Sequence, residues 1–193
     1  MTLPSGALLL VGLLAAQAST AWHDPAPHTV RFVTVDSSVR LEVLDWGGAG
    51  RPILFIGCYL TGHVYDDIAP KLIDQFHVYA VTRRGVGGSD RPTTGYDPQR
   101  RADDILEVID TVAMQKPILI GNSCGGAILH ELGAQHADRL GGLVYLDAAE
   151  NPRLTIAVPT ARIVELPGAN LYMFVSNQAD IIREVRAFAA TLK

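Results

Sequence analysis

The strongest constraint on the fold is one ten-residue stretch, Pro117 to Gly126, which reads PILIGNSCGG. Its apolar run ends in the spacing Gly-x-Ser-x-Gly, and an apolar-rich segment, Ala127 to Leu132, follows. The pattern predicts a buried strand, a sharp turn and a helix. Glycines on both sides of Ser123 remove side chains where the strand and the helix crowd each other. Such a turn lifts the serine hydroxyl above the sheet edge as a candidate nucleophile; the alternative is a serine that caps the helix.

The composition is that of an ordinary globular protein. The 193 residues are 48% hydrophobic and 19% charged, which suits one α/β domain without disordered segments. A net charge of −4 and a pI of about 5.8 provide neither the basic surface of a nucleic-acid-binding protein nor a basic stripe for an anionic membrane. We expect no nucleic-acid partner, and the motifs of the chain predict no cofactor and no metal ion.

Residues 1–18 have the pattern of an export signal. An apolar core runs from Gly6 to Ala16, and Ala16-Gln17-Ala18 matches a signal-peptidase cleavage site. No Lys or Arg precedes the run, which departs from the usual signal peptide, so an uncleaved anchor and a buried helix remain alternatives. The run is short for a transmembrane helix. We therefore expect a signal peptide over residues 1–18, an arm over 19–29 and a single domain over 30–193. Export to the periplasm or the extracellular space would place the chain in an oxidising compartment.

The hydrophobic pattern predicts an α/β fold. His28 to Val35 and Val39 to Trp46 alternate apolar and polar residues, which is typical of an antiparallel hairpin. The continuous apolar run Pro52 to Gly57 indicates a strand that is buried on both faces. The next predicted elements are a helix over 66–74, a strand over 77–82, a helix over 99–113, a strand over 117–121, a helix over 125–136 and a strand over 143–147. This alternation predicts a doubly wound, mostly parallel sheet that binds ligands at the carboxyl ends of its strands.

Three loops follow the predicted strands at that edge, over residues 57–59, 83–90 and 121–126. The second loop is rich in glycine, but Asp90 stands where a dinucleotide-binding fingerprint needs its third glycine. The second loop also contains Arg83 and Arg84, and Arg91 follows it. These arginines could favour anionic substrates, or they are simple solvated charges and ion pairs.

Four motifs in this order resemble the α/β-hydrolase superfamily, and in particular its serine esterases and lipases. The motifs are the strand end over 56–58, the turn over 84–92, the strand-to-helix turn over 121–126 and the strand over 143–149. The resemblance runs from about residue 30 to residue 152 and resumes from 161 to 192. It implies hydrolysis of an ester or a similar acyl bond in a small substrate.

The resemblance also implies roles for four residues. Ser123 would attack the acyl carbon, and the backbone N–H groups of Cys58 and Cys124 would form the oxyanion hole. If the two loops approach each other as in the superfamily, these cysteines are near enough for a disulfide; the alternative is two small buried thiols. Asp147 follows the predicted sixth strand, where some members carry the catalytic acid, although an Asp that caps a turn is an equal alternative.

The general base is the missing part of this resemblance. Members of the superfamily carry a histidine between the last strand, here 162–166, and the closing helix, here about 178–192. This chain has Leu171 at that position and no histidine after His136. Because leucine cannot accept a proton, we expect the Ser123 hydroxyl to be a poor nucleophile unless His63, the nearest histidine in topology, replaces the base.

The cap of the superfamily is also missing from the pattern. Only residues 148–160 separate Asp147 from Ala161, too few for a helical cap, a crossover helix and another strand. The predicted strands 154–158 and 162–166 therefore cannot be parallel neighbours, and we expect a shortened hydrolase fold with a shallow site. Three hypotheses follow: an impaired serine hydrolase, a non-catalytic domain that binds a ligand or a protein, and an internally deleted product.

Overall fold

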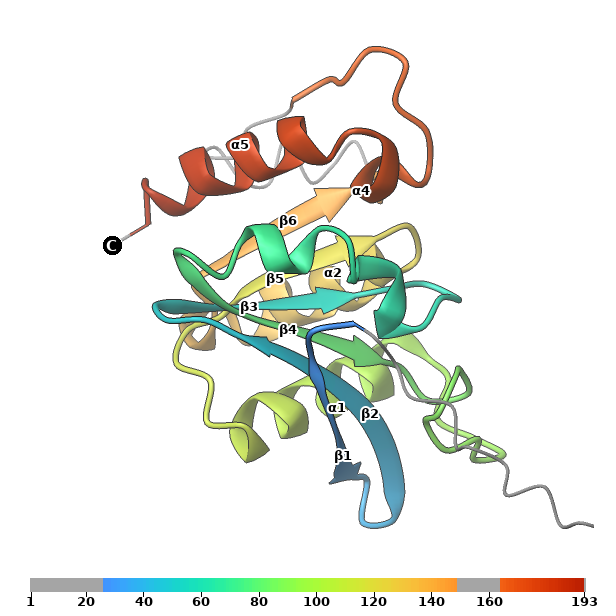
Figure 1. Cartoon of the computed structure of the whole chain (residues 1–193). Helices are drawn as coiled ribbons and strands as arrows, with labels where there is room; N and C mark the ends of the chain where they lie inside the picture. Colours follow the sequence, from blue (N-terminus) through green and yellow to red (C-terminus); the bar gives the residue numbers. More distant parts are fainter. Residues whose placement is uncertain (1–25, 149–163, 193) are drawn as a thin grey trace, which may run out of the picture.

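A computed structural model describes residues 26–148 and 164–192 of the chain (Figure 1). The predicted signal peptide, most of the predicted arm and the predicted strand 154–158 lie outside these residues. The division of the chain into a signal, an arm and one domain therefore stays a prediction.

The core of the structure is one six-stranded sheet with the strand order β1-β2-β4-β3-β5-β6. β1 and β2 form the predicted antiparallel hairpin, and β2 is also antiparallel to β4. β4, β3, β5 and β6 run parallel to one another. The α/β class, the N-terminal hairpin and the mostly parallel sheet are confirmed. The strands are β1 (Thr29–Val35), β2 (Val39–Gly47), β3 (Arg51–Ile56), β4 (Phe76–Thr82), β5 (Ile118–Asn122) and β6 (Gly142–Leu146).

Helices cover both faces of this sheet (Figure 1). α1 (Pro98–Thr111) and α2 (Gly125–Gln135) bury apolar side chains on one face. On the other face lie α5 (Gln178–Ala189), the one-turn α4 (Met173–Ser176) and the short 3₁₀ turns η1 (Gly62–Tyr65) and η2 (Ala69–Lys71). A third 3₁₀ turn, η3 (Ala137–Arg139), follows α2. None of the helices in the described ranges has the length and apolar character of a membrane span.

One predicted helix is wrong, and one predicted strand is not formed in the part that the structure describes. A helix was predicted over residues 66–74, but the only helical turn within that range is the 3₁₀ turn η2, and η1 ends just before it. Pro70 lies in its middle, where proline removes a backbone donor and disfavours helical angles at the preceding residue. The strand predicted over 162–166 is also not formed in its described part, because residues 164–166 have no strand pairing.

The parallel strands bring the loops of interest to one edge of the sheet. Ile56 in β3 is paired with Gly121 in β5, and Asn122 in β5 with Leu146 in β6. The residues that follow these three strands are therefore neighbours, as expected for the ligand-binding edge of a doubly wound sheet.

Candidate active site

The turn at Ser123 has the predicted geometry. β5 ends at Asn122, α2 begins at Gly125, and Ser123 between them has a φ of 51°, a left-handed conformation that is costly for a residue other than glycine. A Cβ at Gly121 would lie 2.8 Å from Leu129 Cδ1, and a Cβ at Gly125 would lie 2.6 Å from the Ile56 carbonyl oxygen. The glycines are needed at these two positions because the strand and the helix leave no room for a side chain.

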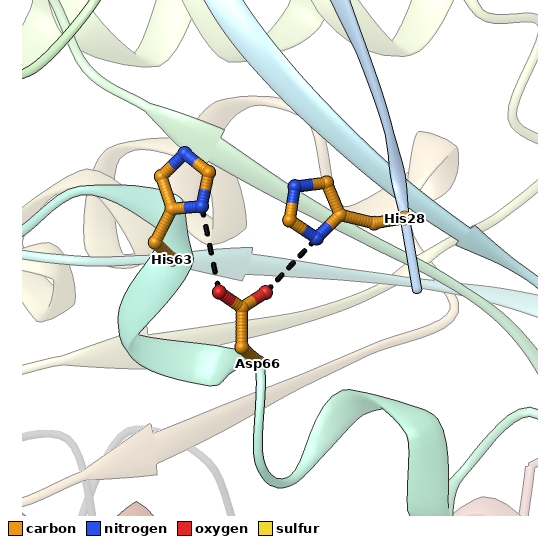
Figure 2. Close-up of side chains that lie close together, drawn as sticks. All are labelled: His28, His63 and Asp66. Carbon is orange, nitrogen blue, oxygen red and sulfur yellow. Dashed lines mark ion pairs between the residues drawn. The ribbon is translucent and has the colours of Figure 1, made fainter. Parts of the chain in front are cut away.

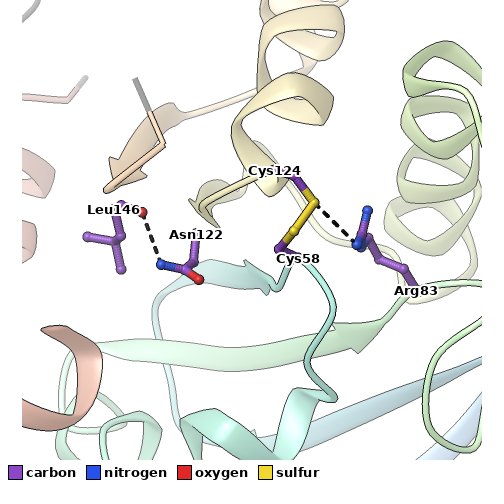
Figure 3. Close-up of a disulfide and its surroundings, with 5 residues drawn as sticks. All are labelled: Cys58, Arg83, Asn122, Cys124 and Leu146. Carbon is purple, nitrogen blue, oxygen red and sulfur yellow. Dashed lines mark hydrogen bonds between the residues drawn. A yellow bond between two sulfur atoms is a disulfide. The ribbon is translucent and has the colours of Figure 1, made fainter. Parts of the chain in front are cut away.

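The two cysteines form a disulfide, which decides between the alternatives that the sequence leaves open (Figure 3). The bond joins Cys58, just after β3, to Cys124, just after Ser123, and their Cα atoms are 4.9 Å apart. It ties together the two residues whose backbone N–H groups are predicted to form the oxyanion hole. Cys124 also caps the N-terminus of α2, where the helix dipole favours negative charge.

Asn122 connects this turn to two further segments. The residue is 2% exposed, and Nδ2 donates to the carbonyl oxygen of Leu146 at 3.1 Å (Figure 3). The same Nδ2 donates to the carbonyl oxygen of Leu171 at 3.2 Å. The N–H of Ser123 donates to the same Leu146 carbonyl at 3.1 Å. The segments that carry Asp147 and Leu171 are thereby held against the Ser123 turn.

The predicted acid and the predicted base position both lie beside this turn, but neither completes a proton relay. Asp147 directly follows β6, is exposed and has a φ of 46°. Leu171 is 41% exposed and carries no group that accepts a proton. Within the described residues, no hydrogen bond joins the Ser123 hydroxyl to Asp147 or to a histidine. His63, the predicted substitute, lies instead near Asp66 and Glu42.

Arg83 lies behind the disulfide as a buried cation. The residue is only 4% exposed, and its Nη2 donates to Cys124 Sγ at 3.6 Å (Figure 3). In the described ranges, Arg83 Nε and Nη1 have no hydrogen-bond partner. Burial lowers the pKa of Arg83 to about 10, and the nearby charge of Arg101 acts in the same direction. The guanidinium remains charged at neutral pH, so it favours negative charge at the predicted oxyanion hole.

The adjacent Arg84 has a structural role, because it is buried in ion pairs with carboxylates. Its side chain is fully buried, and Nε and Nη2 each donate to one carboxylate oxygen of Asp104 at 2.6 Å. Burial acts to lower the pKa of Arg84, but its bonds to Asp104 and Asp36 outweigh this effect and the pKa is raised. Arg91 is exposed and donates to the Gly87 carbonyl at 3.1 Å. Of the two consecutive arginines, Arg84 is neutralised by carboxylates, whereas Arg83 has no ion-pair partner among the described residues.

The arrangement of strands, turn and loops matches a known family. A sequence model described as the Alpha/beta hydrolase family covers residues 47–191. The chain belongs to the α/β hydrolase family. The resemblance read from the four motifs is thereby confirmed, and so is the fold that it implies.

Relatives within the α/β hydrolase family include enzymes with different substrates. The chain is 33% identical over 109 residues to 2-(acetamidomethylene)succinate hydrolase from Mesorhizobium japonicum, which is 56% of this chain and 39% of the relative. It is 29% identical over 154 residues to epoxide hydrolase A from Mycobacterium tuberculosis, covering 75% of this chain and 46% of the relative. The crystal structure of Cfl2 from Burkholderia cenocepacia superposes with a TM-score of 0.63 at 26% identity, over 86% of this chain and 58% of that one. The chain thus spans less than half the length of these two curated relatives.

Within this hydrolase fold, sequence reasoning missed Asn122 and misjudged how Arg83 and Arg84 differ. A polar residue that precedes the nucleophile position inside an apolar strand was the available signal for Asn122. Nothing in the sequence distinguishes the two consecutive arginines, because their difference depends on Asp104, which lies 20 residues further along in α1.

Proposed function

We propose that this α/β hydrolase acts on ester or similar acyl bonds through Ser123, and that its turnover is low because Leu171 occupies the position of the base. The observation that carries the proposal is the left-handed turn at Ser123 beside the disulfide of Cys58 and Cys124. The backbone N–H groups of these two cysteines are the proposed oxyanion hole. Its relatives are hydrolases of several kinds, which supports hydrolysis as the reaction class.

In the proposed reaction, the Ser123 oxygen forms a bond to the acyl carbon while the electron pair of the carbonyl π bond moves to its oxygen. The N–H groups of Cys58 and Cys124 donate to this oxyanion, and the charge of Arg83 stabilises it. The Ser123 O–H bond breaks at the same time, and its proton passes to solvent water. Because the Leu171 side chain cannot accept it, the serine keeps its high pKa and attacks slowly at neutral pH.

The position of Leu171 supports a lost base rather than a different site. Its carbonyl is bonded to Asn122, the residue before Ser123, so a histidine at position 171 would start from a backbone that is already beside the nucleophile. Asp147 follows Leu146, which shares the same Asn122 amide. We infer that Asp147 would orient such a histidine.

The substrate of this site is proposed to be a small ester or acyl compound. A negative charge near the reacting bond would be favoured by the guanidinium of Arg83, which has no carboxylate partner among the described residues. The Mesorhizobium relative is named for the hydrolysis of a succinate derivative, which agrees with an anionic acyl substrate.

The test is the hydrolysis of p-nitrophenyl acetate by the unmodified chain, by Ser123→Ala and by Leu171→His. We expect the unmodified chain to be close to Ser123→Ala and Leu171→His to be clearly faster, with the gain abolished in Ser123→Ala/Leu171→His. Serine-dependent turnover of the unmodified chain at the rate of Leu171→His would show that another group serves as the base.

A second candidate is a non-catalytic hydrolase-like domain that binds a small apolar ligand or a protein. It is favoured by the exposed apolar side chain of Leu171 where the reaction needs a proton acceptor. A folded Leu171→His variant without esterase activity would favour this candidate. Unfolding of the unmodified chain without cooperativity would instead favour an internally deleted product.

We also propose that the protein is exported, as the predicted signal over residues 1–18 suggests. The Cys58–Cys124 disulfide supports this proposal, because disulfides persist mainly in oxidising compartments. Fractionation of expressing cells, with N-terminal sequencing of the product, tests it. A cytosolic product with an intact N-terminus would contradict it.

A further inference from the structure

A second cluster of polar side chains lies where the start of β1 meets η1 (Figure 2). His28 precedes β1, His63 belongs to η1, and Asp66 directly follows η1. His28 Nδ1 is 3.0 Å from Asp66 Oδ1, and His63 Nδ1 is 3.4 Å from Asp66 Oδ2. We propose that these three residues bind a divalent transition-metal ion, with Zn²⁺ as the first candidate.

The separations between the donor atoms suit a small tetrahedral ion. Zn²⁺ binds histidine nitrogen and carboxylate oxygen at about 2.0–2.1 Å, so two ligand atoms of a tetrahedral site are about 3.3 Å apart. The two nitrogen-to-oxygen distances, 3.0 and 3.4 Å, are each close to this value, although they end on different oxygens of Asp66, Oδ1 for His28 and Oδ2 for His63. All three ligand atoms lie within 4.8 Å of one another. Small adjustments of the side chains would place one ion within reach of all three.

The donor set also has the right chemistry. Two imidazole nitrogens and one carboxylate oxygen form a set that binds Zn²⁺ and neighbouring divalent transition metals, whereas Ca²⁺ and Mg²⁺ prefer oxygen alone. Three protein ligands leave a fourth position for water. Both cysteines of the chain are in the disulfide, so no thiolate competes for the ion.

Backbone structure holds His63 and Asp66 in place. The N–H of Asp66 donates to the His63 carbonyl at 3.1 Å, which sets the two side chains three residues apart on one turn. η1 is itself fixed to the sheet, because the N–H of Gly62 donates to Thr82 Oγ1 in β4 at 2.8 Å. Two of the three ligands are therefore positioned before an ion arrives.

The third ligand is equally constrained. The His28 side chain is 1% exposed and lies with its ring centroid 5.2 Å from that of Trp46 in an edge arrangement. The rings of His28 and His63 are 5.1 Å apart between centroids. A buried imidazole that faces a second imidazole and a carboxylate loses little conformational freedom on binding an ion.

A further carboxylate supports the proposed ligand atom of His63. Its Nε2 lies 3.9 Å from Glu42 Oε1, while Nδ1 faces Asp66. Glu42 is itself held by Thr82 Oγ1, which donates to Oε2 at 2.6 Å. Metal-binding histidines commonly donate their second ring N–H to a carboxylate. At 3.9 Å Glu42 is beyond hydrogen-bond distance, but it places negative charge beside the second nitrogen of His63 and leaves the first nitrogen for the metal.

An ion at this site would link the start of the edge strand β1 to the segment that follows the Cys58 loop. No described hydrogen bond joins this cluster to Ser123, so we infer that the ion stabilises the fold and takes no part in ester hydrolysis. In the alternative, Asp66 accepts one hydrogen bond from each imidazole and binds no metal.

The experiment uses the untagged full chain after treatment with EDTA, titrated with Zn²⁺ by calorimetry and by thermal unfolding. We expect one equivalent to bind and the unfolding midpoint to rise by roughly 5–10 °C at a free Zn²⁺ concentration about 100 times the dissociation constant. His63→Ala and the conservative Asp66→Asn should lose both effects. Circular dichroism before titration establishes that each variant is folded.

His77→Ala is the matched control. His77 Nε2 also pairs with a carboxylate, Asp45 Oδ1, at 2.8 Å, and its side chain is 33% exposed against 32% for His63. That pair has no third ligand among the described residues, so His77→Ala should bind Zn²⁺ like the unmodified chain. Absence of a midpoint shift in the unmodified chain, or equal shifts in folded His63→Ala and Asp66→Asn, would overturn the proposal. Co²⁺ provides an independent readout: the visible bands of a tetrahedral complex should form in the unmodified chain and in His77→Ala only.

Discussion

The two halves of the candidate active site differ in how completely they are built. The half around the proposed nucleophile has a left-handed turn at Ser123, a disulfide that joins Cys58 and Cys124, and a buried cation at Arg83. The half for proton transfer has an exposed Asp147 and the apolar side chain of Leu171. Both halves are held together by the side chain of Asn122.

This difference shows that the stabilisation of an oxyanion and the activation of a serine are separable requirements. The first depends on backbone N–H groups, which the strand-to-helix turn positions whatever side chains the neighbouring loops carry. The second depends on one imidazole, which a single substitution is enough to remove. The α/β-hydrolase fold does not require that imidazole, since this chain keeps the fold with Leu171 at the predicted position of the base.

The largest expected effect comes from restoring the base. Leu171→His should raise the kcat/KM for a p-nitrophenyl ester by roughly 10² to 10⁴, the range that a general base provides. If Asp147 orients the new histidine, Asp147→Asn in this variant should remove at least about tenfold of that gain. The same substitution at the exposed Asp138 is the control. Equal rates with and without Asp147→Asn would make Asp147 a turn residue only.

The two buried arginines should respond differently to replacement by methionine. Arg84→Met breaks a buried ion pair and leaves Arg100 as the remaining partner of Asp104, so it should lower the free energy of unfolding by about 3 kcal/mol, the lower end of the range for a broken buried pair. Arg83→Met removes a buried charge without an ion-pair partner in the described ranges, so it should change this free energy by less than about 1 kcal/mol or raise it. Urea unfolding of both variants measures the contrast. Similar losses would show that Arg83 has a structural role.

The disulfide should contribute to stability as well as to the nucleophile half of the site. Its sequence separation of 66 residues closes a long loop, and Cys58→Ser/Cys124→Ser should cost about 2–4 kcal/mol. Dithiothreitol should destabilise the unmodified chain by a similar amount and leave the double variant unchanged. An unmodified chain whose urea midpoint is insensitive to dithiothreitol would show that no disulfide stabilises it.

A smaller effect is expected at the residue that joins the two halves. Asn122→Ala removes the donor to the Leu146 and Leu171 carbonyls and should lower the free energy of unfolding by about 1–3 kcal/mol. In the Leu171→His background it should also reduce activity, because the loop with the new histidine is no longer held beside Ser123. Full activity in that background would show that the loop is positioned by other contacts.

Most of the fold could be predicted because hydrophobic periodicity is local. The pattern predicted strands over 28–35 and 77–82, and the structure has β1 over Thr29–Val35 and β4 over Phe76–Thr82. The Gly-x-Ser-x-Gly spacing likewise predicted the turn between β5 and α2. The predicted helix over 66–74 failed because its apolar spacing suits a helix but Pro70 lies in its interior.

The side-chain environments could not be predicted, because they depend on contacts that are distant in the sequence. The charge of Arg84 is paired because the fold brings Asp104 of α1 and Asp36 of the β1–β2 turn to it, whereas its neighbour Arg83 faces the disulfide. Likewise, no metal was expected from the sequence, since His28 and His63 are 35 positions apart and no short spacing marks them. The sheet places them together by pairing β1 and β4 with β2, on which η1 packs.

The most direct test of the central claim is the labelling of Ser123 by a fluorophosphonate, followed by mass spectrometry of the intact chain and of its peptides. The reagent reacts with a serine whose proton is accepted during attack, and the oxyanion hole binds the phosphoryl oxygen. We predict slow labelling of the unmodified chain, rapid labelling of Leu171→His at Ser123 and none in Ser123→Ala/Leu171→His. Labelling of Ser123 in the unmodified chain as fast as in Leu171→His would contradict the account, because it would mean that a base is already present.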